Sequence, residues 1–304
     1  MPVPNFIMET GFLILLLLPI VSFLVAFFTS PAGVSGAFLL LPFQVSVLGF
    51  TSPSVSATNL VYNLIAIPSG VYRYIREGRM AWPIAFVMIL ATSPGVFIGA
   101  VLRANYFMDP RLFKLFVGLV LVYLGLRVFH SALRPSGKIK ELEKKFKERV
   151  EFMKKRGLPR EAVVRTRKFS FSRIEYEFWG EVFSFNFPAL FTISFLIGII
   201  GGIYGIGGGA ILSSILASVF GLPVYTTAGA TLLSSFLTSV FGVASYYAIN
   251  YPPDWIIGIS LGIGGFFGMY FGARFQRYLP ERTIRFCLSI LVLAVASSYI
   301  AQYL

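Results

Sequence analysis

Long apolar segments separated by short polar turns fill most of the chain, and one polar stretch at 134–185 divides them into two groups. A helix needs about 20 apolar residues to cross a bilayer, and each group holds five segments of roughly that length or slightly less. The segments lie at 11–29, 34–50, 54–75, 82–102, 112–131, 186–203, 206–221, 225–249, 255–275 and 283–303. We therefore expect an all-α polytopic membrane protein, in which a first membrane repeat (1–133) and a second (186–304) flank the polar loop.

The two groups of segments resemble each other in sequence. Short motifs of the first group recur in the second in the same order, at an offset that stays between 171 and 173 residues. The pairs are Gly36-Ala37 with Gly209-Ala210, Ala57-Thr58-Asn59-Leu60 with Gly229-Ala230-Thr231-Leu232, Gly99-Ala100 with Gly272-Ala273, and 111–115 with 282–286. Four ordered matches at a nearly constant offset predict an internal repeat of five helical segments.

The distribution of basic residues predicts how the segments cross the membrane. Cytoplasmic loops are enriched in Lys and Arg, and 15 of the 26 such residues lie between Arg134 and Arg173. The loop 250–254 has none. We therefore expect the 134–185 loop in the cytoplasm, both termini outside the cell membrane, and two inverted repeats, a plan that secondary transporters use. Arg103 would face outside, and we expect its side chain to reach lipid headgroups.

The polar stretch 134–185 divides into a helical part and a strand-like part. Lys138–Arg156 carries apolar residues on one helical face, which predicts an amphipathic helix. Lys168–Phe187 alternates apolar and polar residues around Trp179-Gly180, which predicts a β-hairpin. We interpret this insertion as a solvated cytoplasmic helix and hairpin lying on the membrane surface. A role in binding a cytoplasmic partner is the alternative.

A glycine-rich stretch, Gly201–Ser214, interrupts the second group of segments. Glycine within a helix costs roughly 0.5–1 kcal/mol relative to alanine, so this sequence favours a broken or re-entrant helix pair. The helix that follows, from Ala210 onward, would point its free N–H groups and the positive end of its dipole into the break, where they can bind an anion. The expected backbone donors are Gly205, Gly207, Gly208 and Gly209.

The first group has a weaker copy of this break at Ser30–Gly36. Pro31 and the glycines interrupt the helix, and a hydroxyl is available beside the backbone donors. The expected contributors are Gly33, Ser35 and Gly36. The competing interpretation of both breaks is close helix packing through small residues.

Polar residues cluster in the segments next to the two breaks. Asn59 and Asn63 are four residues apart and so share one helix face in apolar surroundings, where buried amides need partners from a helix or a ligand. Both interpretations, structural hydrogen bonding and ligand contact, stay open. The predicted set is Thr58, Asn59 and Asn63 in the first repeat and Thr231, Ser234 and Ser235 in the second.

The positions of the acidic residues and the small numbers of His and Cys exclude several classes of membrane protein. None of the 13 acidic residues lies in the middle of a predicted span, where cation-coupled transporters place a carboxylate. A single histidine and a single cysteine give no basis for a metal site, and there is no nucleophile–base pair for an enzyme. The chain has a net charge of +13, but 15 of its 26 basic residues lie in the one polar segment instead of being spread along the chain, so we expect no nucleic-acid partner. We also expect no cofactor. An anionic or neutral solute suits the site best.

The chain resembles the TauE/SafE family of sulfite exporters. The resemblance rests on Gly201-Gly202, on Gly205-Ile206-Gly207-Gly208-Gly209, on Ala228-Gly229-Ala230-Thr231-Leu232 and on Ala57-Thr58-Asn59-Leu60. It covers both membrane repeats, although the glycine-rich run of the family is reduced to Gly33-Val34-Ser35-Gly36 in the first. Members are linked to the transport of sulfite, sulfoacetate and other sulfur-containing anions, so the resemblance implies anion transport in the cell membrane.

We therefore expect a secondary transporter of a small, sulfur-containing oxyanion or organosulfonate that works by alternating access. Two alternatives stay open at this point. The chain could be a passive anion channel, or a non-transporting membrane subunit that binds a cytoplasmic partner through residues 134–185.

Overall fold

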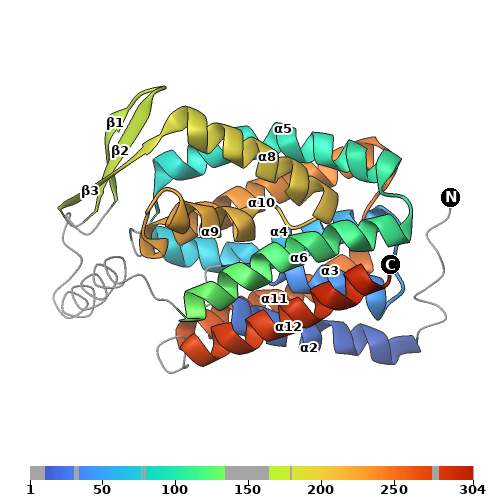
Figure 1. Cartoon of the computed structure of the whole chain (residues 1–304). Helices are drawn as coiled ribbons and strands as arrows, with labels where there is room; N and C mark the ends of the chain where they lie inside the picture. The colour runs from blue at the N-terminus through green and yellow to red at the C-terminus, as the bar shows by residue number, and fades with distance from the viewer. Residues whose placement is uncertain are drawn as a thin grey trace.

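The protein is a bundle of ten described helices with a small β-sheet at one end (Figure 1). The computed structural model describes residues 11–30, 34–76, 78, 80–133, 164–178, 180–275 and 281–303. The amphipathic helix predicted at Lys138–Arg156 and the predicted site residue Gly33 lie outside these ranges. The helices are α2 (Gly11–Thr29), α3 (Ala37–Ser46), α4 (Ser54–Arg76), α5 (Trp82–Tyr106), α6 (Pro110–Leu133), α8 (Phe187–Tyr204), α9 (Gly209–Ser218), α10 (Val224–Ala248), α11 (Trp255–Phe275) and α12 (Glu281–Ala301).

Each predicted apolar segment coincides with one of these helices to within a few residues at either end, so the predicted helical membrane architecture is confirmed. Within the described residues, α5, α6, α8, α10 and α11 are long and apolar enough to cross a membrane. The 23-residue helix α4 is not among them, although it is longer than α8. It is more polar than its neighbours, and 13 of its residues are buried. A helix enclosed by other helices can carry polar side chains that a lipid-facing helix would expose to hydrocarbon.

The two halves of the chain interlock. Helix α2 packs along α11, and α8 packs along α5, so the first helix of each half lies against the fourth helix of the other half. Two glycines mark these contacts: a Cβ atom on Gly99 would collide with the carbonyl oxygen of Ile199, and one on Gly272 with that of Phe27. The central helices α4 and α10 pack on each other, as do α6 and α12. If each helix is replaced by its counterpart in the other half, the same set of pairs results: α2–α11 becomes α8–α5, and α4–α10 and α6–α12 are unchanged.

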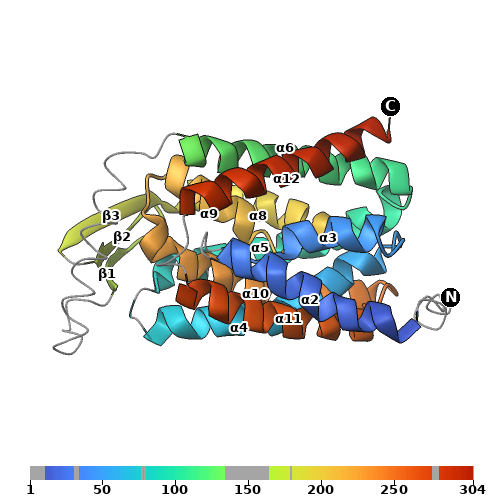
Figure 2. The same ribbon diagram turned by 90° about the horizontal axis from the view of Figure 1, so that it is seen from below.

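Corresponding helices of the two halves run in opposite directions (Figures 1 and 2). Helix α2 begins at the end of the bundle away from the sheet, whereas α8 follows the last strand directly and begins at the sheet end. Likewise, α6 ends near the sheet, whereas α12 ends at the opposite end of the bundle, the end at which α2 begins.

The sheet consists of three antiparallel strands, β1 (Arg165–Phe169), β2 (Arg173–Phe178) and β3 (Glu181–Asn186), in the order β1-β2-β3. Strands β2 and β3 form the predicted hairpin, which turns where Phe178 pairs with Glu181, beside Gly180 with its φ of 80°. Strand β1 was not part of the prediction. All five of its residues are exposed, so its sequence, RTRKF, carries no alternation that would have indicated a strand.

One face of the sheet is attached to the bundle and the other is polar. Ile174, Tyr176 and Phe178 are buried on the attached face. The Tyr176 hydroxyl lies 3.1 Å from Oγ1 of Thr226 at the start of α10, and burial raises the pKa of this tyrosine.

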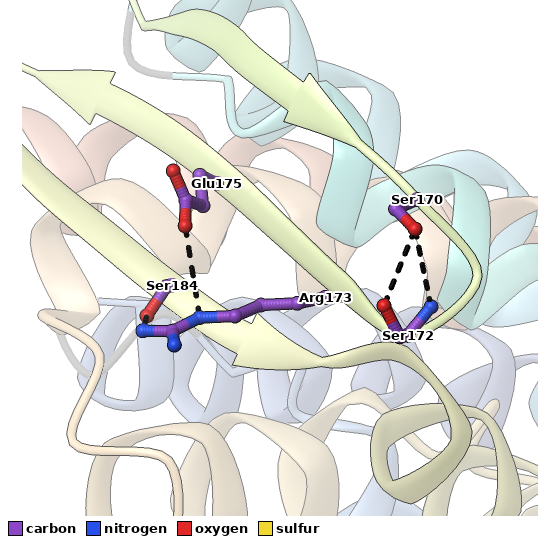
Figure 3. A network of polar contacts seen from close by, with 5 residues as sticks. All are labelled: Ser170, Ser172, Arg173, Glu175 and Ser184. Atoms are coloured by element: carbon purple, nitrogen blue, oxygen red, sulfur yellow. Dashed lines mark hydrogen bonds and ion pairs between the residues drawn. The ribbon is translucent and has the colours of Figure 1, made fainter.

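On the polar face, Arg173 donates to Ser184 at 2.6 Å and lies 3.7 Å from Glu175 (Figure 3). In the turn between β1 and β2, the hydroxyl groups of Ser170 and Ser172 are 3.3 Å apart. The sheet therefore forms its polar contacts within itself on this face and meets the membrane helices through its apolar face.

Candidate functional site

The predicted break in the second half is present, and glycine conformations produce it. Helix α8 ends at Tyr204, and Gly205, with a φ of 78°, closes it by donating its N–H to the carbonyl oxygen of Gly201 at 2.7 Å. Gly207 and Gly208 also have positive φ, of 69° and 76°. L-residues other than glycine rarely adopt this left-handed conformation. The chain can therefore leave one helix and start the next, at Gly209, within four residues.

The start of α9 presents backbone donors without acceptors. The first backbone hydrogen bond after the break runs from the N–H of Leu212 to the carbonyl oxygen of Gly208, at 3.0 Å. The N–H groups from Gly207 to Ile211 have no hydrogen-bond acceptor among the described residues. Together with the positive end of the helix dipole, such groups favour an anion.

Helices α4 and α10 enclose this break closely. A Cβ atom on Gly205 would collide with the backbone of Ser56 in α4, and one on Gly209 would collide with the hydroxyl oxygen of Ser235 in α10. One on Gly209 would also lie 2.8 Å from the carbonyl oxygen of Thr231. The glycines are thus needed for close approach as well as for backbone conformation, and Thr231 and Ser235, two of the predicted site residues, lie beside the start of α9.

The corresponding break in the first half has a different geometry. Helix α3 begins after Gly36, which has an ordinary φ of −67°, and the N–H groups of Leu39 and Leu40 both bond the Gly36 carbonyl oxygen. Ser35 and Gly36 are buried. A Cβ atom on Gly36 would lie 3.0 Å from the hydroxyl oxygen of Tyr62 in α4. A tyrosine hydroxyl therefore lies against the start of α3, whereas the start of α9 is lined by Ser235.

Asn59 connects the two breaks. Its side-chain Nδ2 donates to the carbonyl oxygens of Ala37 and Gly205, both at 2.9 Å, and its Oδ1 accepts a hydrogen bond from Gln44 at 3.0 Å. The Tyr204 hydroxyl adds a second connection by donating to the carbonyl oxygen of Phe38 at 2.7 Å. The two breaks therefore meet inside the bundle. In this conformation the side-chain amide of Asn59 links the start of α3 to the end of α8 through hydrogen bonds.

The other predicted polar residues fall into two groups. Thr58 Oγ1 donates to the carbonyl oxygen of Ser54 and accepts from the N–H of Asp254, both at 2.8 Å, so its side chain faces the start of α11 rather than a break. Asn63 and Ser234 are completely buried, and their polar side-chain atoms have no partner among the described residues. Buried polar atoms without a partner are costly, which makes these two side chains available for a ligand.

The prediction for Arg103 is wrong. Its side chain is completely buried instead of reaching lipid headgroups. The guanidinium donates to the carbonyl oxygens of Phe107 and, at 2.8 Å, of Thr51, and its central carbon lies 3.7 Å from the centre of the Phe113 ring. Two loop carbonyls and an aromatic face contact the charged group inside the protein, so Arg103 fastens the loops before α4 and after α5, although its Nε has no partner among the described residues.

Several residues of the site were absent from the prediction. Tyr62 shares a helix face with Asn59 and Asn63, and this spacing could have identified it. The remaining ones, Ser56, Gln44 and Tyr204, act through contacts with distant parts of the chain. Ser56, for example, donates to the carbonyl oxygen of Ile203 at 2.9 Å. The polar groups that the described residues place at the two breaks are backbone amides, hydroxyls and carboxamides, none of which is ionised.

Comparisons with known proteins agree with this architecture. The profile of the family described as "Sulfite exporter TauE/SafE" matches residues 18–299. The probable membrane transporter protein YunE of Bacillus subtilis (strain 168) is 22% identical over 279 residues, which cover 89% of this chain and 91% of YunE. No solved structure matches the chain. The family consists of membrane transporters and not of enzymes, so this protein is a multi-pass membrane transporter. With nearly its whole length matched, the chain belongs to the TauE/SafE sulfite exporter family.

Proposed function

We propose that this protein is a secondary transporter of a small anion, and that the anion binds where the two helix breaks meet. The observation that carries the proposal is the start of α9, where the N–H groups from Gly207 to Ile211 have no acceptor among the described residues. The described residues around this helix start are buried, and the hydrogen-bonding groups that they supply are neutral. Such a site attracts negative charge through backbone donors and the helix dipole.

A sulfur-containing oxyanion or organosulfonate, such as sulfite or sulfoacetate, is the proposed substrate class. Its oxygen atoms accept several hydrogen bonds at once, which suits donors arriving from two opposed helix starts. Membership of a family described as sulfite exporters supports the same class.

Transport would occur by alternating access between two inverted repeats. The opposite directions of α2 and α8, and of α6 and α12, support this interpretation (Figure 1). So do the packing pairs that persist when the halves are exchanged. Rocking of one half against the other would expose the site first to one side of the membrane and then to the other. The 134–185 loop, rich in basic residues, would face the cytoplasm, with both termini outside.

Two measurements test the function. Purified protein is screened for thermal stabilisation by sulfite, thiosulfate, sulfate, sulfonates and carboxylates, because a ligand that binds only the folded state raises its stability. The protein is then reconstituted into liposomes, and uptake of labelled anion is followed with unlabelled anion trapped inside. A carrier gives saturable counterflow. Absence of both stabilisation and counterflow for every sulfur oxyanion would contradict the proposal, and non-saturable flux would indicate a channel.

A further inference from the structure

Tyr62 differs from the other completely buried tyrosines of the described chain. Four tyrosines have no exposed surface. Tyr176 pairs with Thr226, Tyr204 donates to the carbonyl oxygen of Phe38, and Tyr246 donates to that of Gly202 at 2.8 Å. The Tyr62 hydroxyl has no hydrogen-bond partner of normal geometry among the described residues. Buried hydroxyls ordinarily have partners, so this one needs an explanation.

The hydroxyl of Tyr62 points at the start of a helix. It lies beside the backbone of Gly36, which precedes the ten-residue helix α3. The N–H groups of the first turn of a helix are donors, so an oxygen atom close to them is in a position to accept. The phenolic proton remains without an acceptor. The N–H groups at the start of α3 and the O–H group of Tyr62 therefore lie together as hydrogen-bond donors. Among the described residues, no acceptor is available to the Tyr62 hydroxyl.

Packing fixes the ring of Tyr62 in this place. A Cβ atom on Gly265 of α11 would collide with the ring, so the aromatic face lies directly on the backbone of that helix. A side chain packed this closely has little freedom to turn its hydroxyl elsewhere. The donor is therefore held in place before any ligand arrives, which reduces the entropic cost of binding.

The internal repeat contains the same feature on the other central helix. Ser234 of α10 lies 172 positions after Tyr62, which is the offset between the matched motifs of α4 and α10. Its hydroxyl is also completely buried and has no partner among the described residues. The two repeats thus each place one unpartnered hydroxyl at the same position of the helix that packs behind the break.

We propose that the Tyr62 hydroxyl donates a hydrogen bond to an oxygen of the transported anion at the start of α3. This inference rests on the proposed function and adds a substrate contact to it. The first half has fewer glycines at its break than the second, and the tyrosine supplies a side-chain donor in place of the backbone donors that Gly207 and Gly208 make accessible in the second half.

The test compares Tyr62→Phe with Tyr246→Phe. Both changes remove one buried hydroxyl from a central membrane helix and keep the aromatic ring. Of the two hydroxyls, only that of Tyr246 has a hydrogen-bond partner among the described residues, the carbonyl oxygen of Gly202. Binding of sulfite and thiosulfate is measured by calorimetry, and thermal unfolding is measured without anion. A hydrogen bond to a charged group contributes about 1.5–3 kcal/mol, so Tyr62→Phe should weaken binding by roughly tenfold or more. Its unfolding temperature without anion should equal or exceed that of the wild type.

Tyr246→Phe should show the opposite pattern, with a lower unfolding temperature and wild-type affinity. Wild-type affinity in Tyr62→Phe would overturn the inference and leave the proposed function standing. A loss of anion-free stability in Tyr62→Phe as large as that in Tyr246→Phe would also overturn it, because the hydroxyl would then have a structural partner. Failure of the wild type to bind any sulfur oxyanion would overturn both the proposed function and the inference.

Discussion

The two helix breaks occupy equivalent positions in the two halves of the chain, yet different residue types build them. In the second half, Gly205, Gly207 and Gly208 have positive φ. The backbone N–H groups that follow them have no hydrogen-bond acceptor among the described residues. In the first half, Gly36 keeps an ordinary helical φ, and a tyrosine hydroxyl lies against the start of the helix. One half relies on backbone conformation and the other on a side chain.

Two helix starts at equivalent positions of the two halves can therefore present hydrogen-bond donors through different chemical groups. A helix start is a donor site whatever residues precede it. Under the proposed function, each half needs only to place hydrogen-bond donors where Asn59 joins the two breaks. Glycine conformations and a fixed hydroxyl are two ways to meet that requirement.

The largest expected effect comes from closing the glycine break. In Gly208→Leu, a side chain enters the break beside Ile197, where a Cβ atom would lie 3.2 Å from the Ile197 side chain. We expect anion binding to be lost, as measured by thermal shift and counterflow, while the protein still inserts.

Gly221→Leu is the matched control. Gly221 has a similar φ of 64°, but a Cβ atom there meets no neighbour within 4 Å. Both variants carry the strain of a left-handed leucine, about 1–2 kcal/mol, so a difference in binding isolates the effect of the break. Equal binding by the two variants would show that the break is not the site.

The next effect comes from separating the two breaks. Asn59→Ala removes the donor to the carbonyl oxygens of Ala37 and Gly205 and the acceptor of the Gln44 amide, and a buried polar group left unpaired costs about 1–3 kcal/mol. We expect the free energy of unfolding in mixed detergent micelles to fall by about 2–5 kcal/mol. Asn63→Ala serves as the control, because the Asn63 side chain has no described partner. Similar losses in the two variants would rule out Asn59 as the connection.

A pair of alanine substitutions compares the crowding at the two helix starts. Gly209→Ala places a methyl group against the Ser235 hydroxyl and the backbone of Thr231, whereas Gly36→Ala meets the side chains of Val25 and Tyr62. Side chains can move more easily than backbone. Overpacking costs typically about 1–3 kcal/mol, and we expect Gly209→Ala near the upper end of this range and Gly36→Ala near the lower end.

Adding Ser235→Ala to Gly209→Ala should recover part of the lost free energy of unfolding, because the closest atom is then removed. No recovery would show that the Thr231 backbone dominates the clash.

The smallest expected effect concerns the sheet, which continues directly into α8 of the second half. Tyr176→Phe removes the contact with Thr226, while the Thr226 hydroxyl keeps its bond to the carbonyl oxygen of Pro223. The loss of one neutral hydrogen bond should lower the free energy of unfolding by about 0.5–1.5 kcal/mol. Anion affinity should remain that of the wild type, and a clear loss of affinity would show that the sheet acts on the site.

Much of the fold and part of the candidate site could be predicted from the sequence. Hydrophobic segment length predicted every described helix, because the requirement to span a bilayer acts locally on composition. The glycine run predicted the break, because left-handed backbone conformations favour one residue type. Alternation predicted β2 and β3 but could not reveal β1, whose residues are all exposed.

The amino-acid sequence is sufficient for the properties that depend on a residue and its near neighbours. These are the helices, the glycine break, the absence of acidic residues from the middle of the spans, and the repeated motifs. The tertiary structure is needed to know which buried polar groups form hydrogen bonds and which do not. The Asn59 amide finds Gly205 across 146 positions of sequence, and Arg103 turns inward to Thr51 across 52. Tyr62, on α4 like Asn59, has no hydrogen-bond partner of normal geometry for its hydroxyl among the described residues. Whether a buried polar group has a hydrogen-bond partner depends on which distant segments of the chain lie beside it. A local sequence pattern does not contain this information.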